Sequence, residues 1–242
     1  MAAYSAQESA SRAVTQEAKA LKKVFQSVEI DSCPQTYNFH MHTLCSDGKL
    51  TPEGLMTQAL ELGLQGLAVT DHHTIKGYSR ARQWLEDWRW RHPAAWRSAR
   101  SGKRLPRLWP GVEITASLLD TEVHILGYAF YTDHPAIEPY LEHGPPQGGA
   151  KAAARVIAAI QSAGGLAVLA HPARYRVSAE QLIPAAADMG IDGVEVYYAY
   201  DNPRPWRPTP EKTARVRLMT EQLRLLGTCG TDTHGLNLTR RL

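Results

Sequence analysis

Residues 37–48 read YNFHMHTLCSDG and set the interpretation of the whole chain. The apolar and aromatic half, Tyr37–His42, predicts a strand, and the half that ends in Ser46-Asp47-Gly48 is typical of a loop. His40 and His42 stand two residues apart, so both side chains lie on the same face of that strand. Asp47 follows in the loop. A strand that ends in two imidazoles beside a carboxylate points to a site at the end of a sheet.

The rest of the chain repeats this plan of short apolar runs separated by amphipathic stretches. Further strands are predicted at 66–70, 108–115, 122–130, 166–170, 193–197 and 228–231. Helices are predicted over 9–28, 52–62, from about 79, and over 149–163, 179–189 and 210–226. Alternating strands and helices at this spacing favour parallel strands with helices outside. Seven such strands predict an α/β barrel closed with fewer than the eight units of a TIM barrel.

Two helices carry clear boundary signals. Thr51 is predicted to cap the helix that begins with Pro52 and stops at Gly63. Pro210–Leu226 has the cleanest pattern, because a proline opens the helix and Gly227 is predicted to end it. Its buried stripe is expected to comprise Val216, Met219, Leu223 and Leu226.

The composition excludes several classes of protein. Of the 242 residues, 43% are hydrophobic and 21% are charged, which is ordinary for a folded protein and excludes wholesale disorder. No stretch approaches the ~20 apolar residues that a membrane span needs, and no signal peptide is recognisable. Three widely spaced cysteines, Cys33, Cys45 and Cys229, argue against a disulfide framework. We therefore expect a cytoplasmic protein with no membrane partner, made of an N-terminal helical extension and connection, 1–36, and one domain, 37–242.

The net charge of +3 is too small to require nucleic acid as a partner, but it is unevenly spread. Residues 80–107 hold nine basic side chains against two acidic ones, together with Trp84, Trp88, Trp90 and Trp96. One interpretation is a surface for single-stranded nucleic acid, with phosphate contacts and stacked bases. The other is an outer helix with a solvated basic face and with Trp84 and Trp88 turned into the core. We favour the second, because large aromatic side chains are mostly buried.

Histidines and acids recur near the ends of the predicted strands. They are His40, His42, Asp47, Asp71, His72, Glu113, His124, His171, Glu195, Asp232 and His234. In a parallel barrel the carboxyl ends of the strands form the face on which active sites assemble. Without metal, so many buried ionisable groups would have to be paired or neutralised at a high cost in free energy. We therefore predict a site for more than one divalent ion, and imidazole with carboxylate suits Mn²⁺, Zn²⁺ or Fe²⁺.

Six runs, in this order, resemble the motifs of the PHP (polymerase and histidinol phosphatase) family. They are His40–Gly48, Thr70-Asp71-His72, Gly111-Val112-Glu113, His124, Ala170-His171-Pro172 and Asp232-Thr233-His234. The resemblance spans residues 37 to 234 and implies a distorted seven-stranded β/α barrel that holds two or three divalent ions. The runs 124–128 and 169–175 are most similar to the branch of nucleotide and RNA 5′-phosphate phosphoesterases.

The resemblance also implies a ligand set. His40, His42, Glu113 and Asp232 would bind one ion. Glu113 would bridge to a second ion, completed by His124 and His171. Asp47, His72 and His234 would bind a third. A hydroxide between two ions would be the nucleophile, because adjacent ions lower the pKa of bound water and neutralise charge on a phosphoryl group. Glu113 and His234 would be catalytic residues as well as ligands.

Arg174 is a further candidate for a catalytic role. It follows His171 by three residues, so it is expected in the loop above the metals, where a guanidinium clamps phosphate well; the alternative is a surface arginine.

The loop 202–208, which contains Trp206 between arginines, is either a base-stacking surface or a rigid connector. The related branch carries a long helical insertion after the fourth strand, whereas only residues 131–149 fill that place here. This difference predicts an open site with broad specificity.

Four side chains near the predicted ligands are interpreted separately. Asp71 is expected to orient His72, since ligating imidazoles usually need such a partner, and Glu195 is expected to have a similar supporting role. His73 is expected to lie outside the ligand set. Cys45 is treated as a bystander beside the metal loop.

The leading hypothesis for function is a hydrolase, a metal-dependent phosphoesterase that acts on a small phosphorylated metabolite, a nucleotide or an RNA 5′ end. A second hypothesis is histidinol-phosphate phosphatase, although the sequence shows none of its specific substrate loops. A third is a non-catalytic regulatory module whose barrel holds metal structurally. The complete ligand set favours an enzyme, and no obligate protein partner is evident.

Overall fold

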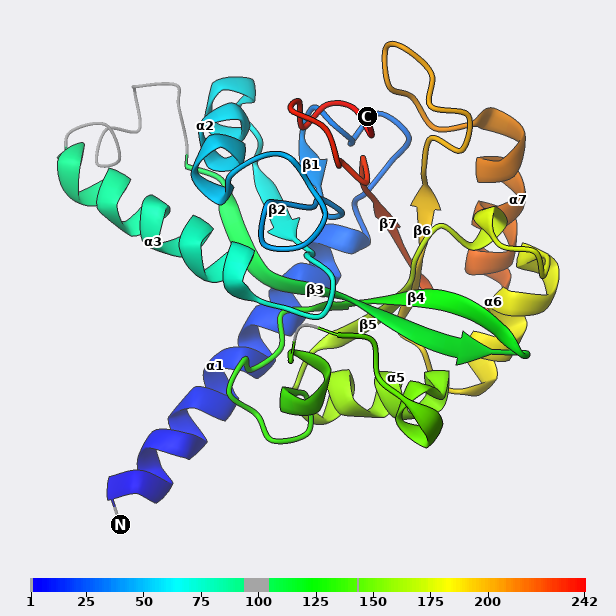
Figure 1. The fold of residues 1–242 in the computed structure, drawn as a ribbon, viewed down its shortest axis with the longest axis horizontal. Coiled ribbons are helices and arrows are strands. Elements are labelled where there is room, and N and C mark those ends of the chain that lie inside the picture. Colours follow the sequence, from blue (N-terminus) through cyan, green and yellow to red (C-terminus); the bar gives the residue numbers. More distant parts are fainter. Residues whose placement is uncertain (1, 94–104, 143) are drawn as a thin grey trace.

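The computed structural model describes residues 2–93, 105–142 and 144–242, and of residues 2–13 only the helical backbone (Figure 1). One sheet contains seven strands in sequence order: β1 (Tyr37–Asn38), β2 (Gly66–Val69), β3 (Arg107–Leu118), β4 (Thr121–Tyr128), β5 (Leu166–Leu169), β6 (Gly193–Tyr197) and β7 (Leu226–Cys229). The helices around it are α1 (Ala2–Phe25), α2 (Pro52–Leu62), α3 (Lys76–Arg91), α5 (Ala153–Ser162), α6 (Ala179–Asp188) and α7 (Pro210–Gln222). Short 3₁₀ turns lie at η1 (Glu138–Tyr140), η2 (Gly148–Lys151) and η3 (Pro172–Arg174). Within the described ranges, no helix combines the length and the apolar character that a bilayer crossing requires.

The segments that follow β1 and β7 pair with each other and so close the barrel. The backbone N–H of His42 donates to the carbonyl of Thr233 at 3.0 Å, and that of Asp232 donates to the carbonyl of His40 at 2.8 Å. The close approach of these two backbone segments requires Gly230, because a Cβ at that position would overlap the Cβ of His40. The prediction of a distorted seven-stranded α/β barrel is confirmed. Barrel closure is also what brings residues from the two ends of the sequence into one site.

One strand departs from the prediction that all the strands are parallel. β4 pairs antiparallel with both β3 and β5. Leu119 and Asp120, with φ of 50° and 54°, form the tight turn of the β3–β4 hairpin. Leu-Asp lacks the Asn-Gly or Asp-Gly signature of such turns, so the sequence pattern gave no sign of the reversal. As a consequence, His124 reaches the site from a strand that runs against its neighbours.

Helix α1 packs on the barrel through its C-terminal half. Leu21 and Phe25 are buried in the main core cluster. The Phe25 ring makes edge contacts with the rings of Phe39 at 5.0 Å and Tyr128 at 5.5 Å between centroids. Such aromatic pairs each contribute about 0.5–1.5 kcal/mol beyond the area they bury. The helix starts earlier and ends earlier than the predicted range 9–28, while the division of the chain at residue 36 stays a prediction.

The boundaries of α2 are confirmed, whereas the end of α7 was predicted wrongly. The Thr51 hydroxyl accepts from the N–H of Gly54 at 3.0 Å. Helix α7 ends at Gln222 rather than at Leu226, because Leu226 and Gly227 pair with β6 as the start of β7. Arg224, at φ 55°, makes the turn between them. Strand pairing therefore overrides the helical pattern of the last predicted turn.

Helix α3 starts at Lys76, three residues before the predicted start, and carries residues 80–91 of the basic segment. Trp84 is half-buried against a second core cluster, which includes Leu55 and Leu85, and the Trp88 ring stacks on His92 at 4.4 Å. Trp90 is 84% exposed. Arg80 pairs with Glu53 of α2 at 2.8 Å. The helix thus presents a solvated basic face, as favoured above, with only Trp84 packed against the core; Trp96 lies outside the described residues.

Candidate metal centre

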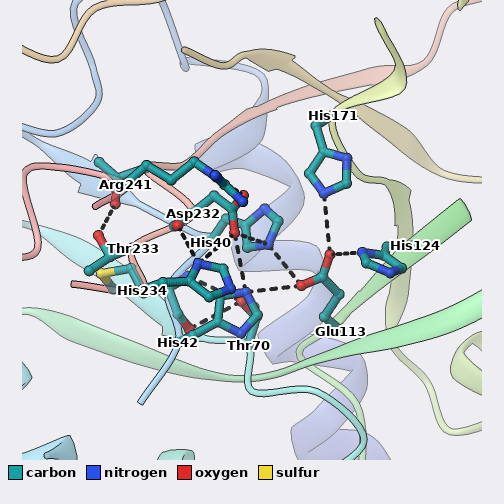
Figure 2. A network of polar contacts seen from close by, with 12 residues as sticks. His40, His42, Thr70, Glu113, His124, His171, Asp232, Thr233, His234 and Arg241 are labelled. Carbon is teal, nitrogen blue, oxygen red and sulfur yellow. Dashed lines mark hydrogen bonds and ion pairs between the residues drawn. The ribbon is translucent and has the colours of Figure 1, made fainter. Parts of the chain in front are cut away.

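All nine predicted metal ligands meet at one end of the barrel. Figure 2 labels each of them except Asp47 and His72. Loops and segments that follow strands supply His40, His42 and Asp47 after β1, His72 after β2, His171 after β5, and Asp232 and His234 after β7. Two come from within strands, Glu113 from β3 and His124 from β4. The convergence that the motif spacing predicted is therefore present in the structure.

Glu113 lies at the centre of the cluster and is buried. Its Oε2 atom lies 3.0 Å from Nε2 of both His40 and His42. The Oδ1 atom of Asp232 lies 3.4 Å from each of the same two nitrogens. Ligand atoms of these four residues all lie within 4.8 Å of one another. This group, called the inner cluster below, has the composition predicted for the first metal position.

The second oxygen of Glu113 faces different partners. Oε1 lies 2.8 Å from Nδ1 of His124 and 3.5 Å from Nε2 of His171. His72 also approaches, with its Nε2 atom 3.6 Å from Oε2 of Glu113. A carboxylate whose two oxygens face two sets of imidazoles is suited to bridge two ions, as the second predicted position requires.

A third group, the outer cluster, surrounds Asp47, whose side chain is 53% exposed. Oδ2 of Asp47 lies 3.2 Å from Nε2 of His234 and 3.7 Å from Nε2 of His72. Oδ1 lies 3.5 Å from Nδ1 of His42. His42 therefore touches both the inner and the outer cluster, whereas it was predicted for the inner position alone.

Several buried atoms at the centre lie close together without forming hydrogen bonds. Both ring nitrogens of His42, Oε1 of Glu113 and Nδ1 of His124 have no hydrogen-bond partner among the described residues. Oε1 of Glu113 is nevertheless only 2.8 Å from Nδ1 of His124. A buried polar atom left without a partner costs about 1–3 kcal/mol. Donor atoms that crowd a common point without bonding to each other fit divalent ions that bind imidazole and carboxylate.

Glu195 on β6 supports the inner cluster from behind. Its oxygens lie 3.0 and 3.2 Å from Nδ1 of His40, and Oε2 also accepts from the backbone N–H of His171 at 2.9 Å. A carboxylate on Nδ1 fixes the ring and turns Nε2 toward Glu113, where Nε2 can bind an ion once it has lost its proton. The supporting role expected of Glu195 is therefore seen in its contacts.

Asp71 has a different partner from the one expected. Its Oδ1 atom accepts from the backbone N–H of Thr43 and from the Ser46 hydroxyl, both at 2.7 Å, and Oδ2 accepts from the Thr43 hydroxyl at 2.7 Å. The carboxylate therefore holds the loop that presents Asp47 rather than orienting the imidazole of His72.

The charges of the centre move the pKa values of its members in opposite directions. Burial acts to lower the pKa of His42, but contacts with Asp232 and Glu113 outweigh burial and raise it to about 9. Burial also opposes ionisation of Glu113 and Asp232, yet the surrounding imidazoles hold the pKa of both carboxyls well below the usual range. Burial, aided by the charge of His42 and opposed by Glu113, lowers the pKa of His72 to about 4. At neutral pH the carboxylates and His72 are thus in the states that metal ligands need, while His42 must release a proton.

Arg174 lies at the rim of the centre, with its side chain 43% exposed. Its Nη1 atom donates to Oδ2 of Asp232 at 3.1 Å and to the Tyr198 hydroxyl at 3.3 Å. The same Oδ2 accepts from the Tyr198 hydroxyl at 2.6 Å and from Nε of Arg241 at 2.8 Å. Sequence reasoning missed Tyr198 and Arg241. The place of Tyr198 directly after β6 was the available signal, whereas nothing in the local sequence marks Arg241.

Three other side chains lie near the centre or in the loop after β6. Trp206 is buried in the main core cluster, so its ring is not free to stack on a base, and the connector interpretation of the loop 202–208 is favoured. His73 is buried, and its Nε2 atom lies 3.0 Å from the Thr115 hydroxyl, outside the described ligand groups. Tyr175 packs behind His124 and accepts from its backbone N–H at 2.8 Å.

The fold and the centre define a class, the β/α barrels that gather histidines and carboxylates at the carboxyl ends of their strands for divalent metal. Comparison with protein families identifies the member of that class. The PHP domain matches residues 38–205, and the chain belongs to the PHP family.

Two similar proteins are named 5′-3′ exoribonucleases. It is 38% identical over 105 residues to the 5′-3′ exoribonuclease Rnm of Salmonella typhimurium, a match that covers 43% of this chain and 31% of that protein. It is 25% identical to a 5′-3′ exoribonuclease of Haemophilus influenzae over an alignment that covers 82% of this chain and 89% of that protein. The match to the Salmonella protein thus spans about a third of that relative's length.

Solved structures support the fold alone. A protein of Bifidobacterium adolescentis assigned as a metal-dependent phosphoesterase superposes with a TM-score of 0.64 at 24% identity, covering 85% of this chain and 93% of that one. An amidohydrolase of Chromobacterium violaceum with bound sulfate gives a TM-score of 0.64 at 21% identity, covering 86% and 90%.

Proposed function

We propose that the chain is a metal-dependent phosphoesterase that hydrolyses phosphate esters of nucleotides or of RNA 5′ ends. The observation that carries the proposal is the position of Glu113, whose two oxygens face two sets of buried imidazoles. Two-metal sites of this kind serve in-line displacement at phosphorus. Two of the relatives are named 5′-3′ exoribonucleases, which favours a nucleotide or RNA over other phosphorylated metabolites.

The proposal includes two or three divalent ions, Mn²⁺, Zn²⁺ or Fe²⁺, held by the nine side chains above. The inner cluster would hold one ion, Glu113 with His124 and His171 a second, and Asp47 with His72 and His234 a third. Bound divalent ions supply a water of lowered pKa and neutralise charge that develops on the phosphoryl group.

The remaining residues prepare the site and bind the substrate. Glu195 fixes the His40 ring, and Asp71 fixes the loop that carries Asp47. Arg174 is exposed enough to turn its guanidinium from Asp232 to a phosphate oxygen, with which it forms a charge-assisted pair. The segment 131–149 contains η1 and the start of η2 in place of a long helical insertion, so the described part of this segment leaves the site open to substrates of different size.

A substrate panel on metal-quantified protein tests the proposal. The panel comprises a short RNA with a 5′ phosphate, the same RNA with a 5′ hydroxyl, nucleotides, an aryl phosphate and histidinol phosphate, each with Mn²⁺ and with a chelator. We expect chelator-sensitive turnover of the 5′-phosphorylated RNA or of the nucleotides. Turnover of histidinol phosphate alone would identify the second enzyme hypothesis, and metal-loaded protein inert on the whole panel would favour a regulatory module.

A further inference from the structure

The Asp232 carboxylate divides its two oxygens between two sets of partners. Oδ1 lies 3.4 Å from a ring nitrogen of each of three histidines, His40, His42 and His234. Oδ2 accepts from the Tyr198 hydroxyl, from Nε of Arg241 and from Nη1 of Arg174. One oxygen is thus directed at the metal position and the other is held by three donors. Figure 2 shows one of these donors, Arg241, beside Asp232.

The two guanidinium groups on Oδ2 differ in how far they reach into solvent. The Arg174 side chain is 43% exposed, whereas that of Arg241 is 17% exposed. One carboxylate balances only one of the two positive charges, so the pair leaves excess positive charge at the mouth of the site. Of the two, Arg174 is free to turn toward an anionic substrate, and Arg241 is placed to stay on Asp232.

The backbone of the segment 234–242 holds Arg241 in that place. It folds back beside α2 and β1 (Figure 1). The carbonyl of Arg241 accepts from the N–H of His234 at 2.7 Å. Leu238, in the middle of the segment, is fully buried, and its N–H donates to the side chain of Gln58 on α2 at 3.0 Å. The segment is therefore anchored to the barrel beside the metal centre.

We propose that Arg241 is a positioning residue that fixes Oδ2 of Asp232, so that Oδ1 stays directed at the inner metal position and Arg174 is released for the substrate phosphate. The part concerning Arg174 rests on the proposed function, and the part concerning metal does not. Partners that orient a ligating group typically contribute about 10–100-fold to metal affinity. The same range is expected for Arg241.

The affinity for Mn²⁺ measured without substrate tests the proposal. Free Mn²⁺ is followed by its EPR signal during titration of metal-free protein, for wild type, Arg241→Ala, Arg241→Lys and Arg240→Ala. Arg240 is the adjacent, exposed arginine and is a matched control for the loss of one positive charge. We expect Arg241→Ala to weaken the tightest Mn²⁺ site by about 10–100-fold, Arg241→Lys to recover part of the loss, and Arg240→Ala to bind as wild type does.

A second variant separates positioning from a folding defect. Tyr198→Phe removes another donor to Oδ2 without altering the segment 234–242, and it is expected to weaken the same site by a smaller factor. Thermal unfolding of the metal-free variants shows whether each one is folded. Wild-type Mn²⁺ affinity in folded Arg241→Ala, or an equal loss in Arg240→Ala, would overturn the assignment. If wild type binds Mn²⁺ but hydrolyses no phosphate ester, the proposed function fails while the role of Arg241 stands.

Discussion

The inner and outer clusters contain the same types of ligand but differ in burial and support. His40, Glu113 and Asp232 are buried, and the side chains that hold them include Glu195, Tyr198 and Arg241. Asp47, by contrast, is more than half exposed, and its contacts are with histidines and Ser46. Ligands fixed before the ion arrives lose less freedom when they bind it. The inner cluster should therefore hold metal more tightly, and the outer cluster should exchange it with solvent.

The largest effect is expected from the inner cluster. His42→Ala or Asp232→Asn should abolish turnover and remove at least one bound ion while leaving the fold largely intact, because each removes a ligand that nothing nearby replaces. Steady-state kinetics, metal analysis and circular dichroism check the three parts. Wild-type rates in either purified variant would refute the inner position.

The outer cluster should respond more weakly. Asp47→Asn removes the carboxylate that joins His72 to His234, so it should lower the number of bound ions by one and reduce turnover less than Asp232→Asn does. Metal analysis after brief dialysis against chelator measures both variants side by side. An Asp47→Asn protein as inactive and as metal-free as Asp232→Asn would remove the distinction between the clusters.

This comparison also shows how much of the site could be predicted from the sequence alone. The spacing of His40 and His42 predicts a shared face because a strand alternates its side chains, and residues after strands predict a common end of the barrel. Burial does not follow from such patterns, because it depends on pairing between the two ends of the sequence. Arg241 reaches Asp232 only because the last segment folds back over the barrel. Asp71 was given the wrong partner for a similar reason, since its carboxylate meets a loop placed by another strand.

Arg174 should affect catalysis but not metal content. A charge-assisted pair with phosphate in a partly desolvated site contributes roughly 1.5–3 kcal/mol, so Arg174→Ala should lower kcat/KM by about ten- to a hundredfold. Lysine should restore only part of the loss, because it supplies the charge without the planar fork. If Arg174→Ala instead loses metal, the residue supports Asp232 in the way proposed for Arg241. If its kinetics are unaltered on every substrate, the phosphate clamp lies elsewhere.

Substrate choice should be permissive, because we propose that the short segment 131–149 leaves the site open. We expect modest differences in kcat/KM among phosphomonoesters of different size in the substrate panel. A single substrate preferred by several orders of magnitude would show that another part of the chain closes over the site.

The smallest effect concerns pH and the metal-free protein. The pKa of His42 is about 9 in the fold, above the ordinary value of 6.5, so the folded state binds this proton more tightly than the unfolded state does. That contribution to stability is fully present below pH 6.5 and is lost as the pH rises through about 9. His40 and His124 shift in the same direction, because the carboxylates outweigh burial in both. The pKa of His72 is lowered to about 4, so its titration changes the stability of the fold only below pH 6.5. It therefore does not oppose the loss of stability expected above that pH.

The Tm of chelator-treated protein should therefore fall by several degrees between pH 6.5 and 9. The metal-loaded protein should not follow, since a bound ion replaces the proton and its apparent affinity rises as His42 deprotonates. Calorimetry of both forms across this range measures the difference. Asp47→Asn is the matched control for His42→Ala, because it alters the centre but leaves Glu113 and Asp232 in contact with His42. A steeper fall in wild type than in His42→Ala would locate the effect at the inner cluster. A Tm of metal-free wild type that rises over the same range would show that burial, rather than the carboxylates, controls these imidazoles.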